Sequence, residues 1–116
     1  MPRPAIDTIE GAKAGIIAFG STEPAIREAR DQLLAQGIKM DFMRIKAVPF
    51  TSEVQTFIQN HDRLYVIEMN RDGQLHQLLS LEYPDQVMKL ISLAHTDGLP
   101  LTARRVRESI LAKEEK

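Results

Sequence analysis

The sequence predicts one α/β domain in which helices cover both faces of a mostly parallel sheet, giving three α/β/α layers. Its 116 residues fit a single domain, and 43% of them are hydrophobic, which is enough for a packed core. Short apolar runs alternate with amphipathic segments along the chain, the pattern of repeated β-α units. Residues 64–67 are apolar on both faces of a strand, as expected where helices cover the sheet on each side. Right-handed crossovers then make the sheet largely parallel.

The first part of the chain predicts a buried strand and an amphipathic helix. Residues 15–19 form the apolar run of the strand. The helix is capped by Ser21 or Thr22, runs to about Gln36 and ends at Gly37. Its apolar stripe, at helical spacing, comprises Ile26, Ala29, Leu33 and Leu34.

The middle of the chain predicts a second strand and a short helix. Residues 39–45 alternate in polarity, with Met40 and Phe42 facing inward. Ser52 and Gln55 have the spacing of a capping box, which opens the helix. The stripe that this helix buries comprises Val54, Phe57 and Ile58.

The second half predicts two more strands, each followed by a helix. The third strand covers residues 63–69 and the next helix covers residues 73–81. The fourth strand covers residues 87–94, and Thr102 caps the last helix. The side chains expected in the core here are Leu75, Leu78, Leu79, Val106 and Ile110.

The N-terminal residues allow one further strand. Residues 5–10 could form a short antiparallel strand at the edge of the sheet. We therefore expect an N-terminal extension or edge strand over residues 1–10 and the α/β domain over residues 11–116.

Composition excludes several classes of protein. The formal net charge is −1, which argues against a general nucleic-acid binder. The chain has no cysteine, so it can supply neither a disulfide nor thiolate ligands to an iron–sulfur cluster. Residues 1–4 do not begin a signal peptide, and no apolar run approaches the length of a membrane span. We expect a soluble, cytoplasmic protein that contacts neither membrane nor nucleic acid.

Polar, glycine-containing segments follow the predicted strands. In parallel sheets, ligands and partners meet the segments at the carboxyl ends of the strands, so these segments should lie along one rim. The N-termini of the helices that begin there could hold a phosphate or carboxylate, although plain helix capping explains the same residues more often. The candidate rim residues, for an interface or a ligand, are Ser21, Thr22, Glu68, Asn70, Asp72, Gly73, Gln74, His95 and Asp97.

Residues 68–75 are the densest polar cluster of the rim. Glu68 closes an otherwise apolar strand, and a half-buried carboxylate there needs a partner such as a backbone N–H, Arg71 or another chain. It either shapes a site at a subunit boundary or binds its own turn, and the two readings have equal weight.

The sequence lacks the common catalytic motifs. A hydrolase using Ser21, His95 and Asp97 is conceivable, but no serine has the G-x-S-x-G surroundings of a nucleophile elbow. His61 and His76 lack the spacing of a helical metal site, and we expect them near a helix C-terminus and on the surface, respectively. Neither glycine-rich nucleotide motif is present, nor is the Gly-Asp-Gly start of a thiamine diphosphate motif. We assign no catalytic, cofactor-binding or metal-binding residue.

Ordered blocks of the sequence resemble a known family. Residues 66–79 (VIEMNRDGQLHQLL) look like a signature of the alpha subunits of 2-oxoacid:ferredoxin oxidoreductases, of the 2-oxoglutarate or pyruvate type. Residues 15–25 (GIIAFGSTEPA), 44–50 (RIKAVPF) and 95–102 (HTDGLPLT) extend the resemblance. It covers nearly the whole domain.

The resemblance implies a role inside a larger enzyme. The fold would be that of a transketolase C-terminal domain. The whole enzyme would convert a 2-oxoacid and coenzyme A to an acyl-coenzyme A and carbon dioxide, passing electrons to ferredoxin. Thiamine diphosphate, Mg and iron–sulfur clusters would be held by other domains of the alpha subunit or by the beta subunit, which would be the partners of this chain. The alternative is a stand-alone α/β module that binds a small anion or regulates another protein.

Overall fold

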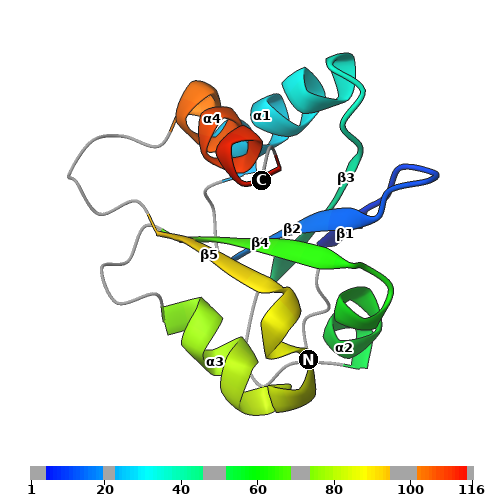
Figure 1. Ribbon diagram of the computed structural model, residues 1–116, viewed down its shortest axis with the longest axis vertical. Coiled ribbons are helices and arrows are strands. Elements are labelled where there is room, and N and C mark those ends of the chain that lie inside the picture. Colours follow the sequence, from blue (N-terminus) through cyan, green and yellow to red (C-terminus); the bar gives the residue numbers. More distant parts are fainter. Residues whose placement is uncertain (1–4, 20–22, 46–51, 69–73, 95–101, 115–116) are drawn as a thin grey trace.

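The computed structural model describes residues 5–19, 23–45, 52–68, 74–94 and 102–114. Within these residues, five strands form one sheet in the order β1-β3-β2-β4-β5 (Figure 1). The strands β2, β3, β4 and β5 are parallel, and β1 pairs with β3 in the antiparallel direction. The predicted fold class is therefore confirmed. The strands are β1 (Ala5–Asp7), β2 (Ala14–Phe19), β3 (Met40–Ile45), β4 (Arg63–Glu68) and β5 (Leu90–Ala94).

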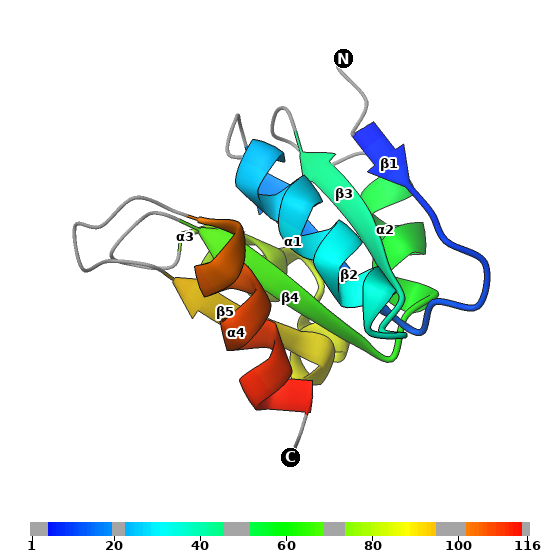
Figure 2. The same cartoon turned by 90° about the horizontal axis from the view of Figure 1, so that it is seen from above.

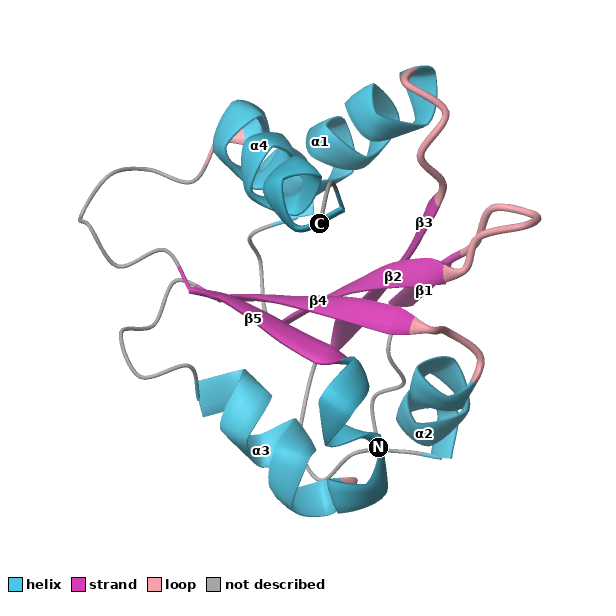
Figure 3. Cartoon of the chain, in the orientation of Figure 1, coloured by secondary structure: helices cyan, strands magenta, loops and turns pink. Residues whose placement is uncertain are grey.

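Helices cover both faces of the sheet. One layer holds α1 and α4, which lie side by side, and the opposite layer holds α2, α3 and the short 3-10 helix η1 (Figures 1 and 2). Figure 3 shows the sheet between these layers. The helical elements are α1 (Glu23–Ala35), α2 (Ser52–Gln59), α3 (Gln74–Glu82), η1 (Pro84–Lys89) and α4 (Ala103–Glu114).

Alternate residues of β2 face the two layers. Ile16 belongs to the core beneath α1 and α4, whereas Ile17 belongs to the core beneath α2 and α3, and both are fully buried. Gly15 lies under α2, where a Cβ atom would be 2.9 Å from Leu64 Cδ2 and 3.0 Å from Phe57 Cζ. A side chain there would force the ends of Leu64 and Phe57 to move, so glycine allows this close packing between the sheet and α2.

Most predicted elements begin and end within two residues of the expected positions. The antiparallel edge strand is present at β1, inside the range 5–10. The N–H of Arg105 donates to Thr102 Oγ1 at 3.2 Å, which confirms Thr102 as the cap of α4. Val106 and Ile110 are fully buried, as expected.

The fourth strand was predicted too long. The strand β5 begins at Leu90, and residues 84–89, which include the expected strand residues 87–89, form the 3-10 helix η1. Pro84 lies in the first turn of η1, where its fixed φ suits a helical turn. Met88 is 93% exposed and adds nothing to the core.

Two leucines expected in the core are exposed instead. Leu34 on α1 and Leu78 on α3 keep 42% and 47% of their surface, whereas their neighbours Leu33 and Leu79 are fully buried. A step of one residue turns a helix by about 100°, so only one leucine of each adjacent pair can face the sheet.

No helix within the described ranges is long and apolar enough to cross a membrane.

This difference within α3 predicts unequal effects of two adjacent substitutions. We expect Leu79→Ala to lower the free energy of unfolding by about 2–5 kcal/mol, because it leaves a cavity under α3. Leu78→Ala should change it by less than about 1 kcal/mol, since that side chain keeps much of its contact with water. Urea unfolding followed by circular dichroism measures both, and equal losses would contradict this orientation of α3.

Candidate functional site

The carboxyl ends of the parallel strands lie at one level across the sheet. Phe19 pairs with Ile45 on one side of β2, while Ala18 pairs with Ile67 on the other. At the outer strand, Glu68 pairs with Ala94. The register therefore brings the ends of β3, β2, β4 and β5 to a common edge, as the rim hypothesis requires.

The order of the strands reverses at this edge between β2 and β4. The chain passes from β2 to β3 through α1, returns across β2 through α2 to β4, and continues outward through α3 to β5. The helices that follow β2 and β4 lie on opposite faces of the sheet (Figure 1). Such a reversal separates neighbouring strand ends, and open α/β sheets bind ligands there.

The structure places two of the predicted rim residues. Glu68 is the last residue of β4, and Gln74 is the first residue of α3. The remaining predictions lie outside the described residues and stay predictions, namely Ser21, Thr22, Asn70, Asp72, Gly73, His95 and Asp97. The strands that precede these residues do reach one edge.

A buried histidine–aspartate pair lies elsewhere in the fold. Within it, His61 Nε2 is 2.7 Å from Asp41 Oδ2, and His61 Nδ1 is 2.6 Å from the carbonyl oxygen of Phe57. The other oxygen of Asp41 accepts the backbone N–H of Ile9 at 2.6 Å. The pair thus joins the end of α2, the strand β3 and the turn after β1.

This geometry indicates a structural role for the pair. A carbonyl oxygen only accepts, so Nδ1 of His61 carries a proton. Nε2 lies against the Asp41 carboxylate, so both ring nitrogens of His61 have a partner within the fold. His61 and Asp41 are only 5% and 8% exposed, which closes the pair to a substrate.

The pair was missed in the sequence, where His61 was only placed near a helix C-terminus. The available signal was Asp41, a charged residue inside a strand of otherwise apolar inward positions, because a buried carboxylate needs a partner. Its partner lies 20 residues away, and only the fold brings the two together.

We expect Asp41→Ala to lower the free energy of unfolding by about 3 kcal/mol, because it leaves buried donors of His61 and Ile9 unpaired. Asp41→Asn should be milder, since its amide oxygen can still accept the Ile9 N–H. The exposed Asp62→Ala is the control and should stay within about 0.5 kcal/mol. Thermal and urea unfolding test this, and a small loss for Asp41→Ala would refute a structural role.

A second polar cluster joins the amino end of β4 to the last turn of α4. Nε and Nη2 of Arg63 both donate to Glu114, each at 2.5 Å, and the hydroxyl of Tyr65 also donates to Glu114. The hydrogen bonds from Arg63, assisted by the one from Tyr65, hold the pKa of Glu114 below its ordinary value. Burial and the bond to Glu114 raise the pKa of Tyr65 above its usual 10.

The lowered pKa of Glu114 gives its contribution a defined pH dependence. Because folding depresses this pKa, the stabilisation is complete above the ordinary value of 4.5 and is lost as pH falls through the folded-state value. At pH 7 we expect Glu114→Gln to cost about 1 kcal/mol, since Arg63 is partly exposed. Unfolding curves from pH 7 to pH 3 should show the two proteins converging in acid; a gap that persists at pH 3 would contradict the assignment.

Metal-ligand geometry does not appear in the described ranges. No three His, Cys, Asp or Glu side chains there come together as a metal site. His76 binds the edge strand instead, with Nε2 3.1 Å from the carbonyl oxygen of Leu90.

Comparisons with known proteins relate this fold to a group of enzymes. Neither a family model nor a curated protein sequence matches the chain. A solved structure of 2-oxoglutarate:ferredoxin oxidoreductase from Magnetococcus marinus, with 2-oxoglutarate, coenzyme A and succinyl-CoA bound, matches with a TM-score of 0.77 and 28% identity. The match covers 97% of this chain and 20% of that one.

Two further structures share the fold. A split-gene transketolase, described as an inactive beta4 tetramer, matches with a TM-score of 0.75 and 18% identity over 95% of this chain and 41% of that one. The alpha chain of a probable 2-oxoacid ferredoxin oxidoreductase from Thermoplasma acidophilum matches with a TM-score of 0.62 and 18% identity. That match covers 98% of each chain. The resemblance predicted from the sequence is therefore confirmed, and this chain spans one fifth of the Magnetococcus marinus chain.

Proposed function

We propose that this chain is the C-terminal domain of the alpha subunit of a 2-oxoacid:ferredoxin oxidoreductase, with a structural role and no catalysis by itself. The observation that carries the proposal is the match over 97% of this chain to 20% of the Magnetococcus marinus enzyme chain, at 28% identity. The structural match to an alpha chain of such an enzyme from Thermoplasma acidophilum agrees with it in fold.

The residues of this chain do not fit the redox cofactors of such an enzyme. An iron–sulfur cluster needs thiolate ligands, and the chain has no cysteine. We place the clusters, thiamine diphosphate and its Mg in other domains or the beta subunit, as the family resemblance implies. There the 2-oxoacid, either 2-oxoglutarate or pyruvate, would be decarboxylated with coenzyme A, and ferredoxin would accept the electrons.

The exposed apolar side chains on the layer of α2 and α3 support a packing role. Leu81 on α3 is 80% exposed and Met88 on η1 is 93% exposed, and Leu78 on α3 adds a third partly exposed side chain. The helices α3 and η1 contact each other, so these side chains come from neighbouring elements of one layer. Grouped exposed apolar residues commonly mark contact surfaces. We assign this surface, together with the rim at Glu68, to contacts with the rest of the alpha subunit and with the beta subunit.

A capture experiment tests the proposal. The tagged chain is expressed in its source organism and recovered, and the eluate is assayed for reduction of a viologen dye that depends on a 2-oxoacid and coenzyme A. We expect dye reduction in the captured material and none from the purified chain alone. Turnover by the purified chain would contradict the absence of catalysis, and an inactive eluate from folded bait would count against membership of the enzyme.

Substitutions on the apolar surface sharpen the test. Leu81→Asp and Met88→Asp place a charge where we expect a partner, and each should reduce the captured activity at least about tenfold. Gln55→Asp, at an exposed position of α2, is the matched control and should leave it unchanged. If all three variants capture equal dye-reducing activity, this surface is not part of the interface.

The stand-alone alternative predicts a different result. Saturable binding of coenzyme A or a 2-oxoacid to the purified chain, with capture giving no dye reduction, would favour a small-anion-binding or regulatory module.

A further inference from the structure

A hollow of about 380 Å³ lies at the amino ends of the strands, at the edge of the sheet opposite the candidate rim. Pockets that bind small molecules in proteins have volumes of this order or larger. A β-strand rises about 3.3 Å per residue, so the six-residue β2 separates the two edges by roughly 17 Å. The residues that line the hollow are Gly11, Lys13, Ala14, Gly37, Ile38, Lys39, Arg63 and Glu114.

Strand register brings positive charges together around the hollow. Ala14 is the Cα partner of both Met40 and Arg63, on the two sides of β2. Lys13 precedes Ala14 and Lys39 precedes Met40, so the two lysines enter neighbouring strands at the same level, next to Arg63. The backbone N–H of Asp62 donates to the carbonyl oxygen of Lys13 at 2.7 Å and joins the start of β4 to the start of β2.

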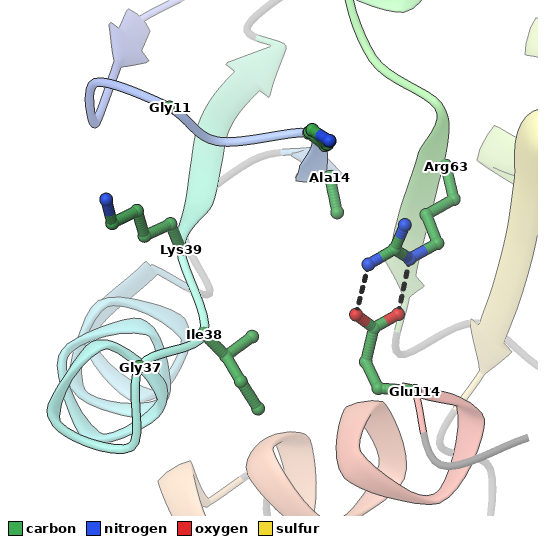
Figure 4. Close-up of a pocket in the computed structure, with 8 residues that line it drawn as sticks. Gly11, Ala14, Gly37, Ile38, Lys39, Arg63 and Glu114 are labelled. Atoms are coloured by element: carbon green, nitrogen blue, oxygen red, sulfur yellow. Dashed lines mark hydrogen bonds and ion pairs between the residues drawn. The ribbon is translucent and has the colours of Figure 1, made fainter.

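The guanidinium of Arg63 is positioned before any ligand arrives. It forms a two-point contact with Glu114, whose oxygens accept from Nε and Nη2 of Arg63 (Figure 4). The Tyr65 hydroxyl also donates to Glu114. The charge of Glu114 is thereby balanced by Arg63 itself. Nη1 of Arg63 takes no part in these bonds, so it can donate to a ligand.

Glu114 is paired with Arg63, so the positive charges of the two lysines are not neutralised by it. Within the described ranges, neither Lys13 nor Lys39 forms an ion pair, and both are exposed. Lys39 extends toward the turn at Gly11, where its Nζ lies 3.5 Å from the position a Cβ would occupy (Figure 4). Gly11 and Gly37 both have positive φ and leave bare backbone at the hollow. The lining thus carries two uncompensated positive charges beside the apolar side chains of Ala14 and Ile38.

We propose that this hollow binds a small phosphorylated anion. A phosphoryl group at neutral pH carries up to two negative charges, which match the two lysines. Lysine ammonium groups bind phosphate as point charges, and Nη1 of Arg63 supplies a fixed donor. The apolar lining suits a short carbon skeleton attached to the phosphate. The site goes beyond the assembly role, because it lies at the other edge of the sheet and uses none of the rim residues.

Amide chemical shifts of the full 116-residue chain, labelled with ¹⁵N, test the site by titration with inorganic phosphate at constant ionic strength. We expect saturable shifts at Gly11, Ala14 and Gly37. Lys39→Gln and Lys13→Gln should each weaken binding about tenfold, as the loss of a charge-assisted contact implies. Arg104→Gln removes one exposed positive charge from the first turn of α4, at the opposite end of that helix from Glu114, and should change the affinity less than about twofold.

Three outcomes would overturn the site. Shifts that rise linearly without saturating would indicate non-specific screening, and an equal loss of affinity in Arg104→Gln would show that only overall charge matters. Succinate binding as tightly as phosphate would reject a phosphoryl ligand in favour of a general carboxylate site. The purified chain is used throughout, so failure here leaves the proposed role in the oxidoreductase untouched.

Discussion

Burial of β2 on both faces of the sheet is the constraint from which the other contacts follow. Ile16 and Ile17 point to opposite layers and are each fully buried, and every such side chain contributes about 1.5–3 kcal/mol relative to an exposed one. A strand covered in this way is typical of a parallel sheet with a helical layer above and below it. Gly15 lets the side chains of Phe57 and Leu64 pack directly against the backbone of β2, because they occupy the space that a side chain would fill.

Parallel pairing around β2 gives the two edges of the sheet different chemistry. At the carboxyl edge, the strands end at one level and the chain reverses direction between β2 and β4, which is the arrangement of a ligand or partner site. At the amino edge, strand register gathers Lys13, Lys39 and Arg63, and Glu114 ties the last turn of α4 to β4. A carboxylate at a helix C-terminus opposes the helix dipole, so the Arg63 contact offsets an unfavourable position.

Polar contacts connect the edge strand β1 to neighbouring elements. Asp41 accepts from Ile9 and pairs with His61, so one buried carboxylate connects the edge strand β1 to the helix α2. Arg27 on α1 adds an exposed contact to Asp7 of β1 at 2.7 Å, which stabilises the same edge only weakly. These contacts add to the backbone pairing of β1 with β3, which extends over only three residues.

The amino-acid sequence by itself determined the fold class, the order of the elements and the family resemblance, because hydrophobic periodicity and turn residues act over a few neighbouring positions. It also identified Thr102 as a cap, since capping depends on residues three apart. Only the tertiary structure decided that β5 starts at Leu90, that Leu78 faces outward, and that His61 meets Asp41 and Arg63 meets Glu114. These features depend on which surfaces of separate elements face each other, and partners 20 or 51 residues apart leave no local pattern in the sequence.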